Sequence, residues 1–281
     1  MLRAVTAFLL LALLTLATSA ETPAVEVIRD LAYHEGKDAD PVKHKLDLYL
    51  PPGRKDYPLL VFVHGGGWLH GDKNFWFDLY GKIGRSFAGQ GIGVAVINYR
   101  LAPKSKHPDQ ANDVAEAIGW LYKNIAKYGG KAEQLFLAGH SAGGHLVSLV
   151  ASDPRFLQAV GMSRTSIKGV ISISGVYDVK PDVILFDKVF GTDADERAKA
   201  SPITHVQAGL PPFLIVHGDH ELPQCDGPCA EIFYHKLQDA RVTCKLLPIA
   251  KRDHMSIIAR VSEANDPGQL AILQFIRTSK P

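Results

Sequence analysis

Gly139-His140-Ser141-Ala142-Gly143 is the most informative stretch of this sequence. It directly follows the apolar run Gln134–Ala138 and directly precedes Gly144-His145-Leu146-Val147. A strand, a sharp turn and a helix are therefore expected, with Ser141 at the apex of the turn. The two flanking glycines fit this interpretation because so tight a turn leaves no room for side chains and holds the serine oxygen clear of the backbone.

A serine at such an apex is a nucleophile only if the chain also supplies a base, an acid and donors for an oxyanion. The motif His64-Gly65-Gly66-Gly67-Trp68 follows the apolar run Leu59–Val63. Its glycines let backbone N–H groups approach a ligand, and we expect those of Gly66, Gly67 and Ala142 to bind the oxyanion. A phosphate loop is the alternative, but no Gly-Lys-Ser/Thr follows the glycines.

The general base is expected downstream of the nucleophile. Of the later histidines, His235 lies within a helical pattern, Glu231–Gln238, whereas His254 lies just past the last predicted strand. A loop position at a strand end is suited to reach Ser141, so we predict that His254 takes the serine proton. A surface histidine is the alternative for this position.

Two carboxylates are candidates for the acid. Asp219 and Glu221 both follow the apolar run Phe213–Val216, and one of them must accept the imidazole N–H of His254 and hold its tautomer. The other would bind local backbone N–H groups, as carboxylates in turns do. The same short loop could also be a metal cluster, but ligands so close along the chain rarely converge. We expect neither a metal nor a cofactor.

The rest of the chain alternates short apolar runs with longer helical patterns. Val25–Ala32 and Lys45–Leu50 have the pattern of antiparallel opening strands. Solid apolar runs, typical of strands buried on both faces of a parallel sheet, occur at Leu59–Val63, Gly93–Ile97, Leu135–Ala138, Val170–Ile173 and Phe213–Val216. Val242–Leu247 and Gln269–Ile276 are the predicted last strand and closing helix. This alternation predicts an α/β fold: a mostly parallel, doubly wound sheet of about eight strands, with helices on both faces and no large cap domain.

The amino terminus has the pattern of an export signal. Arg3 is followed by the apolar stretch Ala7–Ala17 and by Thr18-Ser19-Ala20, a small-residue cleavage site. The apolar stretch is shorter than the ~20 residues that a membrane span requires. We therefore expect a signal peptide at 1–20, a periplasmic or secreted location after cleavage near Ala20, and no stable membrane anchor. Residues 21–281 would then form one catalytic domain.

Charge and cysteine content narrow the classes of function. Lysine plus arginine total 31 and aspartate plus glutamate total 29, so the near-neutral surface offers no footprint for nucleic acid. The expected partner is a small molecule, with the oligomeric state left open. In an oxidising compartment Cys225 and Cys229 can form a disulfide around a small loop, leaving Cys244 over, and three free thiols are the alternative.

These motifs resemble those of α/β-hydrolase superfamily carboxylesterases, in particular the exported branch of feruloyl and acetyl esterases and kynurenine formamidase-like enzymes. The resemblance covers most of the mature chain and rests on four motifs: 64–68, Asn98–Pro103, the serine turn extended to His145, and Asp253-His254. It implies that the acid lies four residues after His217, which is Glu221, where aspartate is commoner in the family. Asp219 remains the alternative acid.

The expected function is hydrolysis of small soluble esters by a Ser-His-Glu/Asp triad through an acyl-enzyme. Trp68 and His145 are expected to contact substrate, and the aromatic residues around them to line an apolar pocket: Phe75, Trp76, Phe77 and Tyr80. Residues 182–199 are too few for a cap domain and could form a short helical insertion over the site. The alternatives are an arylformamidase-like amide hydrolase and a non-catalytic binding module of the same fold.

Overall fold

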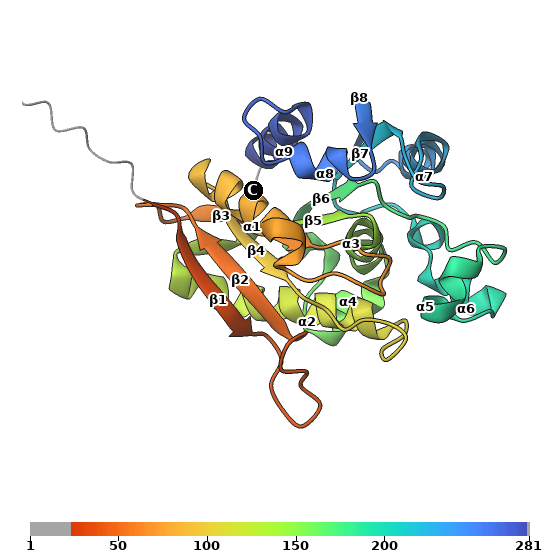
Figure 1. The fold of residues 1–281 in the computed structure, drawn as a ribbon, viewed down its shortest axis with the longest axis horizontal. Coiled ribbons are helices and arrows are strands. Elements are labelled where there is room, and N and C mark those ends of the chain that lie inside the picture. Colours follow the sequence, from red (N-terminus) through yellow and green to blue (C-terminus); the bar gives the residue numbers. More distant parts are fainter. Residues whose placement is uncertain (1–23, 280–281) are drawn as a thin grey trace, which may run out of the picture.

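A single eight-stranded sheet runs through the middle of the molecule (Figure 1) in the order β1-β2-β4-β3-β5-β6-β7-β8. The computed structural model describes residues 24–279, and the predicted signal peptide lies outside them. The strands are β1 (Glu26–Ala32), β2 (Lys45–Leu50), β3 (Tyr57–Val63), β4 (Gly93–Ile97), β5 (Gly130–His140), β6 (Ile167–Ile173), β7 (Phe213–His220) and β8 (Cys244–Asp253). Every predicted strand is present.

The sheet is mostly parallel. β1 pairs with β2 and β2 with β4 in antiparallel fashion, and every pairing from β4 to β8 is parallel. The α-helices are α1 (Phe75–Gly89), α2 (Asp109–Asn124), α3 (Ala142–Ser152), α4 (Pro154–Ala159), α5 (Asp187–Phe190), α6 (Ala194–Ala200), α7 (Gly227–Asp239), α8 (Ser256–Arg260) and α9 (Pro267–Thr278). The alternation of strands and helices confirms the predicted α/β architecture.

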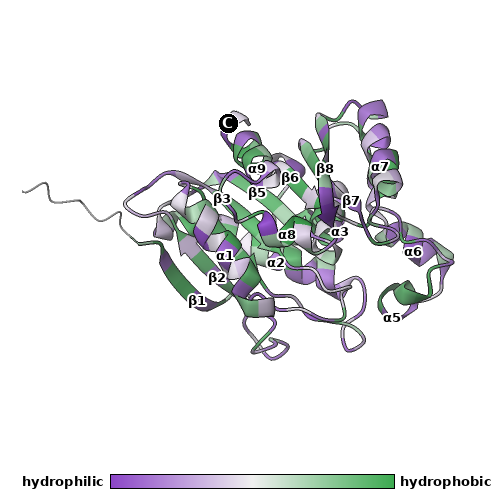
Figure 2. Ribbon diagram, turned by 45° about the horizontal axis from the view of Figure 1, so that its top comes forward, coloured by the Kyte–Doolittle hydropathy of each residue, from purple (hydrophilic) through white to green (hydrophobic). Residues whose placement is uncertain are grey.

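Two hydrophobic cores cover the two faces of the sheet. Side chains of α2, α3 and α7, such as Val114, Leu146 and Phe233, belong to one core. Side chains of α1 and α9, such as Phe87 and Ile272, belong to the other. Figure 2 shows the middle strands mostly in the hydrophobic colour, whereas α7 carries polar residues on its outer side. The sheet is therefore doubly wound, as predicted. Within the described part of the chain, no helix has the length and apolar character to cross a membrane.

The last two strands are longer than the apolar runs that predicted them. β7 ends at His220 rather than Val216, and β8 ends at Asp253 rather than Leu247, with His220 paired to Asp253. Most of the extra residues are polar or glycine, and Ile249 is the one large apolar side chain among them, so no continuous hydrophobic pattern marks the extensions. Their pairing brings the ends of the two strands together at the carboxyl edge of the sheet, where ligands bind in open α/β folds.

The stretch 182–199 forms the expected short helical insertion. It contains α5, α6 and a 3-10 turn, Ile184–Phe186, and lies at the margin of the molecule in Figure 1. The buried Arg197 holds it together: its guanidinium donates to the carbonyl oxygens of Lys180 (2.8 Å) and Gly191 (2.7 Å) and pairs with Asp187. The insertion therefore has a fixed shape beside the carboxyl edge of the sheet.

Candidate active site

Ser141 lies at the apex of the turn between β5 and α3, with φ 56° and ψ −120°. Such a backbone conformation is strained for a residue with a side chain and requires tight packing on both sides. A Cβ atom on Gly139 would lie 2.3 Å from the backbone of Gly143, and one on Gly143 would lie 2.1 Å from the carbonyl oxygen of Val63. The two glycines are therefore required here, as the sequence indicates.

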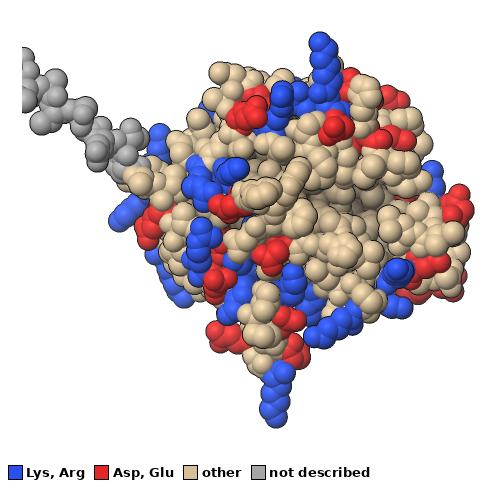
Figure 3. Space-filling view, in the orientation of Figure 1, with Lys and Arg blue, Asp and Glu red and all other residues tan. Residues whose placement is uncertain are grey.

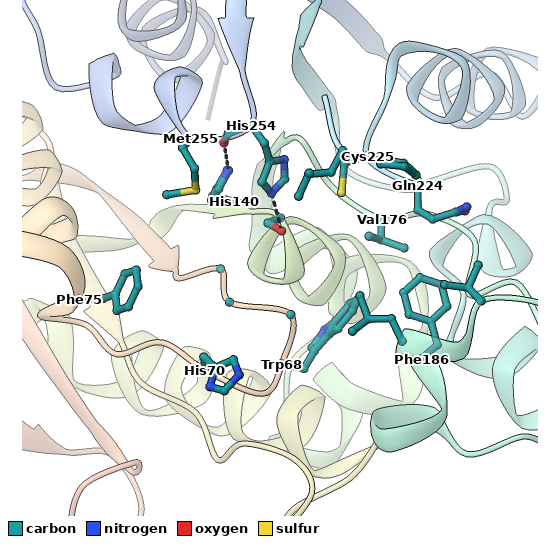
Figure 4. A pocket seen from close by; sticks show the side chains of 18 of the residues that line it. Trp68, His70, Phe75, His140, Val176, Phe186, Gln224, Cys225, His254 and Met255 are labelled. Carbon is teal, nitrogen blue, oxygen red and sulfur yellow. Dashed lines mark hydrogen bonds between the residues drawn. The ribbon is translucent and has the colours of Figure 1, made fainter. Parts of the chain in front are cut away.

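The structure brings Ser141, His254 and Glu221 into one hydrogen-bonded series. Nε2 of His254 lies 2.9 Å from Oγ of Ser141, and Nδ1 lies 2.6 Å from Oε2 of Glu221. A carboxylate only accepts hydrogen bonds, so Nδ1 carries the proton and Nε2 is free to accept from the serine hydroxyl. Figure 4 shows the His254 imidazole, with a dashed line for its hydrogen bond to the serine hydroxyl. This is the arrangement of a nucleophile, a base and an orienting acid.

Glu221 is held in an ionised state by three donors. Its side chain is 1% exposed, and besides His254 it accepts from the Ser174 hydroxyl and from the Gly218 N–H at 2.9 Å. Burial raises the pKa of the Glu221 carboxyl, but the hydrogen bonds from His254, Ser174 and Gly218 outweigh burial and lower the pKa below its usual value. The carboxylate is therefore charged and fixed in direction.

Asp219 takes the structural role that was left open for the second carboxylate. It accepts from the backbone N–H groups of Lys251 (2.8 Å) and Arg252 (3.0 Å) and bonds the exposed His220. The Lys251 N–H and the His220 ring hold the pKa of Asp219 well below its usual range. The structure thus places Glu221, and not Asp219, against His254. Within residues 24–279, no three His, Cys, Asp or Glu side chains converge as metal ligands.

The oxyanion site is expected at three backbone N–H groups. No hydrogen-bond acceptor in the described part of the chain meets the N–H groups of Gly66, Gly67 or Ala142. The N–H of Gly65 is not available, because it donates to the Tyr80 hydroxyl at 3.0 Å. Ala142 is also the first residue of α3, so the positive end of the helix dipole lies at the same point. These amides can stabilise negative charge beside Ser141.

The glycine loop is fastened by the segment that follows β4. The Tyr99 hydroxyl donates to the His64 carbonyl at 3.1 Å, and the Ala102 N–H donates to the Trp68 carbonyl at 2.9 Å. Farther along the loop, the Lys73 N–H donates to the side chain of Asn98 at 2.6 Å. The motif at 98–103 is therefore part of the architecture: it holds the loop that carries the free amides.

Of the two residues expected to contact substrate, Trp68 and His145, only Trp68 lines the active-site cavity. His145 is 0% exposed and does not reach the cavity. Nδ1 of His145 accepts from the indole N–H, and Nε2–H donates to the Ala200 carbonyl at 2.8 Å. The expectation that His145 contacts substrate is corrected: both ring nitrogens are occupied, and the side chain lies beneath Trp68 as a support.

A cavity of about 640 Å³ opens over Ser141. Its lining is mostly apolar and includes Trp68, Phe75 and Tyr80 among the predicted aromatic residues. Trp76 and Phe77 do not line it and are 46% and 86% exposed. In Figure 3 the surface is hollowed where uncharged side chains gather, and Lys, Arg, Asp and Glu lie mainly around it. The cavity favours an uncharged ligand.

Three residues of the site were not singled out from the sequence. Ser174 directly follows β6 and holds Glu221, and its position past a buried strand is the signal that could have revealed it. His140 bonds the main chain of His254. Cys225 is buried and lines the cavity with its thiol against Ser141.

All three cysteines are free thiols in the structure, so no disulfide closes the small loop at 225–229.

The sheet order, the serine turn and the residues at the strand ends together define an α/β-hydrolase. Residues 46–225 match the BD-FAE family model, and the chain belongs to the BD-FAE family. Among curated relatives, it is 33% identical to esterase LipC of Mycobacterium tuberculosis, over 59% of this chain and 45% of LipC. It is 28% identical to isoprenylcysteine alpha-carbonyl methylesterase ICME of Arabidopsis thaliana, over 83% of this chain and 57% of ICME. The chain spans about half the length of the curated relatives it matches.

Solved structures share the fold over nearly the whole described chain. A truncated carbohydrate esterase from gut microbiota has a TM-score of 0.78 at 19% identity, covering 92% of this chain and 98% of that one. Esterase B from Lactobacillus rhamnosis has a TM-score of 0.75 at 24% identity, covering 92% and 85%. At these identities the likeness establishes the fold alone.

Proposed function

We propose that the protein is a serine carboxylic-ester hydrolase that acts on small soluble esters through an acyl-enzyme. The observation that carries the proposal is the hydrogen-bonded series from Ser141 through His254 to Glu221, which lies beside backbone amides that have no acceptor among residues 24–279. A nucleophile, its base and an oxyanion site are the three parts that acyl transfer requires.

In the proposed reaction, Ser141 Oγ attacks the ester carbonyl carbon while Nε2 of His254 takes the hydroxyl proton. Glu221 stabilises the resulting imidazolium, and the amides at Gly66, Gly67 and Ala142 bind the oxyanion, each such donor being worth ~100- to 1000-fold in rate. His254 then gives its proton to the leaving alcohol, and the acyl group stays on the serine. Water, deprotonated by the same imidazole, attacks the acyl-enzyme and releases the acid.

The comparisons support ester chemistry. LipC is named an esterase and ICME a methylesterase, and the chain matches both over more than half of its own length. The uncharged lining of the cavity supports neutral esters as substrates. The signal-peptide pattern at 1–20 supports the proposal that the protein is exported and acts in the periplasm or outside the cell.

The test is hydrolysis of a series of p-nitrophenyl esters of increasing chain length, run beside feruloyl, acetyl-sugar and N-formylkynurenine substrates. Ser141→Ala is expected to lower kcat by about 10⁴-fold or more. Ser148→Ala is the matched control, because Ser148 lies about two turns along α3 and, among residues 24–279, its hydroxyl bonds only the Gly144 carbonyl, at 2.7 Å. A fluorophosphonate probe should label the wild type and Ser148→Ala but not Ser141→Ala. Full activity in Ser141→Ala would overturn the proposal.

A further inference from the structure

His140, the residue before the nucleophile, is bonded to the main chain of the residue that carries the base. Its Nε2 lies 2.9 Å from the carbonyl oxygen of His254, an interaction drawn as the second dashed line in Figure 4. A carbonyl oxygen only accepts, so Nε2 of His140 carries the hydrogen. Because His140 ends β5 and His254 follows β8, this single bond joins the strand of the nucleophile to the loop of the base.

The ring of His140 is fixed and uncharged. It is 2% exposed, and its Nδ1 has no hydrogen-bond partner among the described residues. Burial, together with the neighbouring His254, lowers the pKa of His140 to about 3. The two imidazole rings lie 4.7 Å apart between centroids. A neutral His140 therefore adds no positive charge against the imidazolium that His254 becomes during the proposed reaction.

Glu221 orients the imidazole of His254 through Nδ1, whereas the other hydrogen bonds that hold this loop act on its neighbours in the chain. The Asp253 carboxylate accepts from the Met255 and Ser256 N–H groups at 3.0 and 2.7 Å, and Asp219 binds the amides two and three residues before His254. These bonds shape the loop, whereas the His140 bond holds the backbone of His254 itself. The imidazole is thus held at two points, its ring by Glu221 and its backbone by His140.

We propose that His140 is a positioning residue that sets the distance between Ser141 Oγ and His254 Nε2. The inference rests on the proposed function, since it concerns the step in which the serine proton moves to His254. Near-attack geometry is sensitive to displacement, and a shift of about 1 Å can cost about 100-fold in rate. His140 does not touch the proton or the substrate carbonyl, and it acts through the loop that it holds.

A pair of amide variants separates positioning from packing. The amide nitrogen of His140→Gln reaches nearly as far as Nε2 and can still donate to the His254 carbonyl. The shorter amide of His140→Asn ends near the position of Nδ1 and cannot reach it, and His140→Leu removes the donor while keeping an apolar side chain. We expect Leu and Asn to lower kcat by about 10- to 100-fold with little change in KM. Gln should restore most of the lost rate.

His107→Leu is the control for the loss of a histidine outside the active site. His107 is half-buried, packs against Phe156 and Phe190, and lines a separate pocket from Ser141. The His107→Leu variant should have a lower thermal midpoint but an unchanged kcat. That result would show that lost stability alone does not lower the rate. All variants are checked for folding by circular dichroism before assay.

The outcomes are distinct for the two claims. If the wild type fails to hydrolyse esters, or Ser141→Ala hydrolyses them normally, the proposed function is wrong. If the wild type is active and His140→Leu or His140→Asn retains full kcat, the positioning role is wrong. Equal losses in the Gln and Asn variants would also overturn it, because only Gln preserves the bond.

Discussion

The indole N–H of Trp68 donates a hydrogen bond to Nδ1 of His145, with 3.2 Å between the two nitrogens. The other nitrogen of the imidazole donates to the Ala200 carbonyl at the end of α6. Trp68 itself has φ 60°, a conformation that a residue with a side chain adopts only when its surroundings hold it. One buried histidine therefore couples the glycine loop to α3 and to the insertion beside the site.

Removing this histidine should destabilise the protein through the groups it leaves unpaired. His145→Leu leaves the buried Trp68 N–H and the Ala200 carbonyl without hydrogen-bond partners. Each unsatisfied buried group lowers the free energy of unfolding by about 1–3 kcal/mol. Trp68→Phe removes the donor in advance, so the double variant should lose less free energy of unfolding than the two single variants together. Urea denaturation of the four proteins measures this coupling. Strictly additive losses would show that the bond contributes nothing.

The two carboxylates after β7 should give opposite results when each becomes an amide. Glu221→Gln keeps the shape but cannot stabilise the imidazolium of His254, so kcat should fall by about 10³- to 10⁴-fold. Asp219→Asn weakens the clamp on the Lys251 and Arg252 amides and should reduce stability while kcat stays close to that of the wild type. The assay is p-nitrophenyl ester hydrolysis at saturating substrate. A large kcat loss in Asp219→Asn alone would reverse the assignment.

The sequence predicted the parts of this site whose cause is local. The serine turn needs glycines at 139 and 143 because the backbone itself crowds them, so the requirement is visible in the motif. The buried strands are visible because both faces of a parallel sheet must be apolar. These features depend on residues near in sequence or on a simple pattern, and the structure has each of them where it was predicted.

What the residues alone could not decide depends on contacts between distant segments. The family resemblance predicted Glu221 as the acid, but the residues themselves left Asp219 open as well, and the pairing of β7 with β8 brings Glu221 to His254. His145 is part of the serine motif, but a motif does not show that the ring points away from the cavity toward Ala200. Ser174 directly follows a third strand, β6, and joins the site only when the sheet forms.

Buried histidines should make the protein less stable in mild acid. Burial lowers four pKa values, to about 4 for His64 and His107 and to about 3 for His140 and His145. In the unfolded chain these rings take up protons near pH 6.5, so each ring favours unfolding as the pH falls from about 6.5 toward its folded pKa. His34 acts in the opposite sense, because its pKa is raised by its carboxylate partners although burial opposes this.

Between pH 6.5 and its folded pKa, each histidine with a lowered pKa contributes a slope of about 1.4 kcal/mol per pH unit to the free energy of unfolding. We expect urea denaturation at pH 7, 6, 5.5 and 5 to give falling stability, above the range in which carboxylates protonate. His107→Leu should reduce the slope by about one proton, because it removes one ring that the unfolded chain would protonate. A profile that is flat from pH 6.5 to 5 would contradict the neutral state assigned to these rings.

Cys225 should limit the size of the acyl or alcohol group that fits beside Ser141. Its thiol lines the cavity, and burial raises its pKa to about 12, so it is a small neutral wall residue and not a thiolate. Cys225→Phe fills space next to the nucleophile and should lower kcat/KM for the longer p-nitrophenyl esters by about 10- to 200-fold relative to the acetate. Cys244→Phe, with the same added ring at the start of β8 and outside the cavity lining, is the control and should leave the chain-length preference unchanged. An unaltered preference in Cys225→Phe would mean that the ester binds away from this wall.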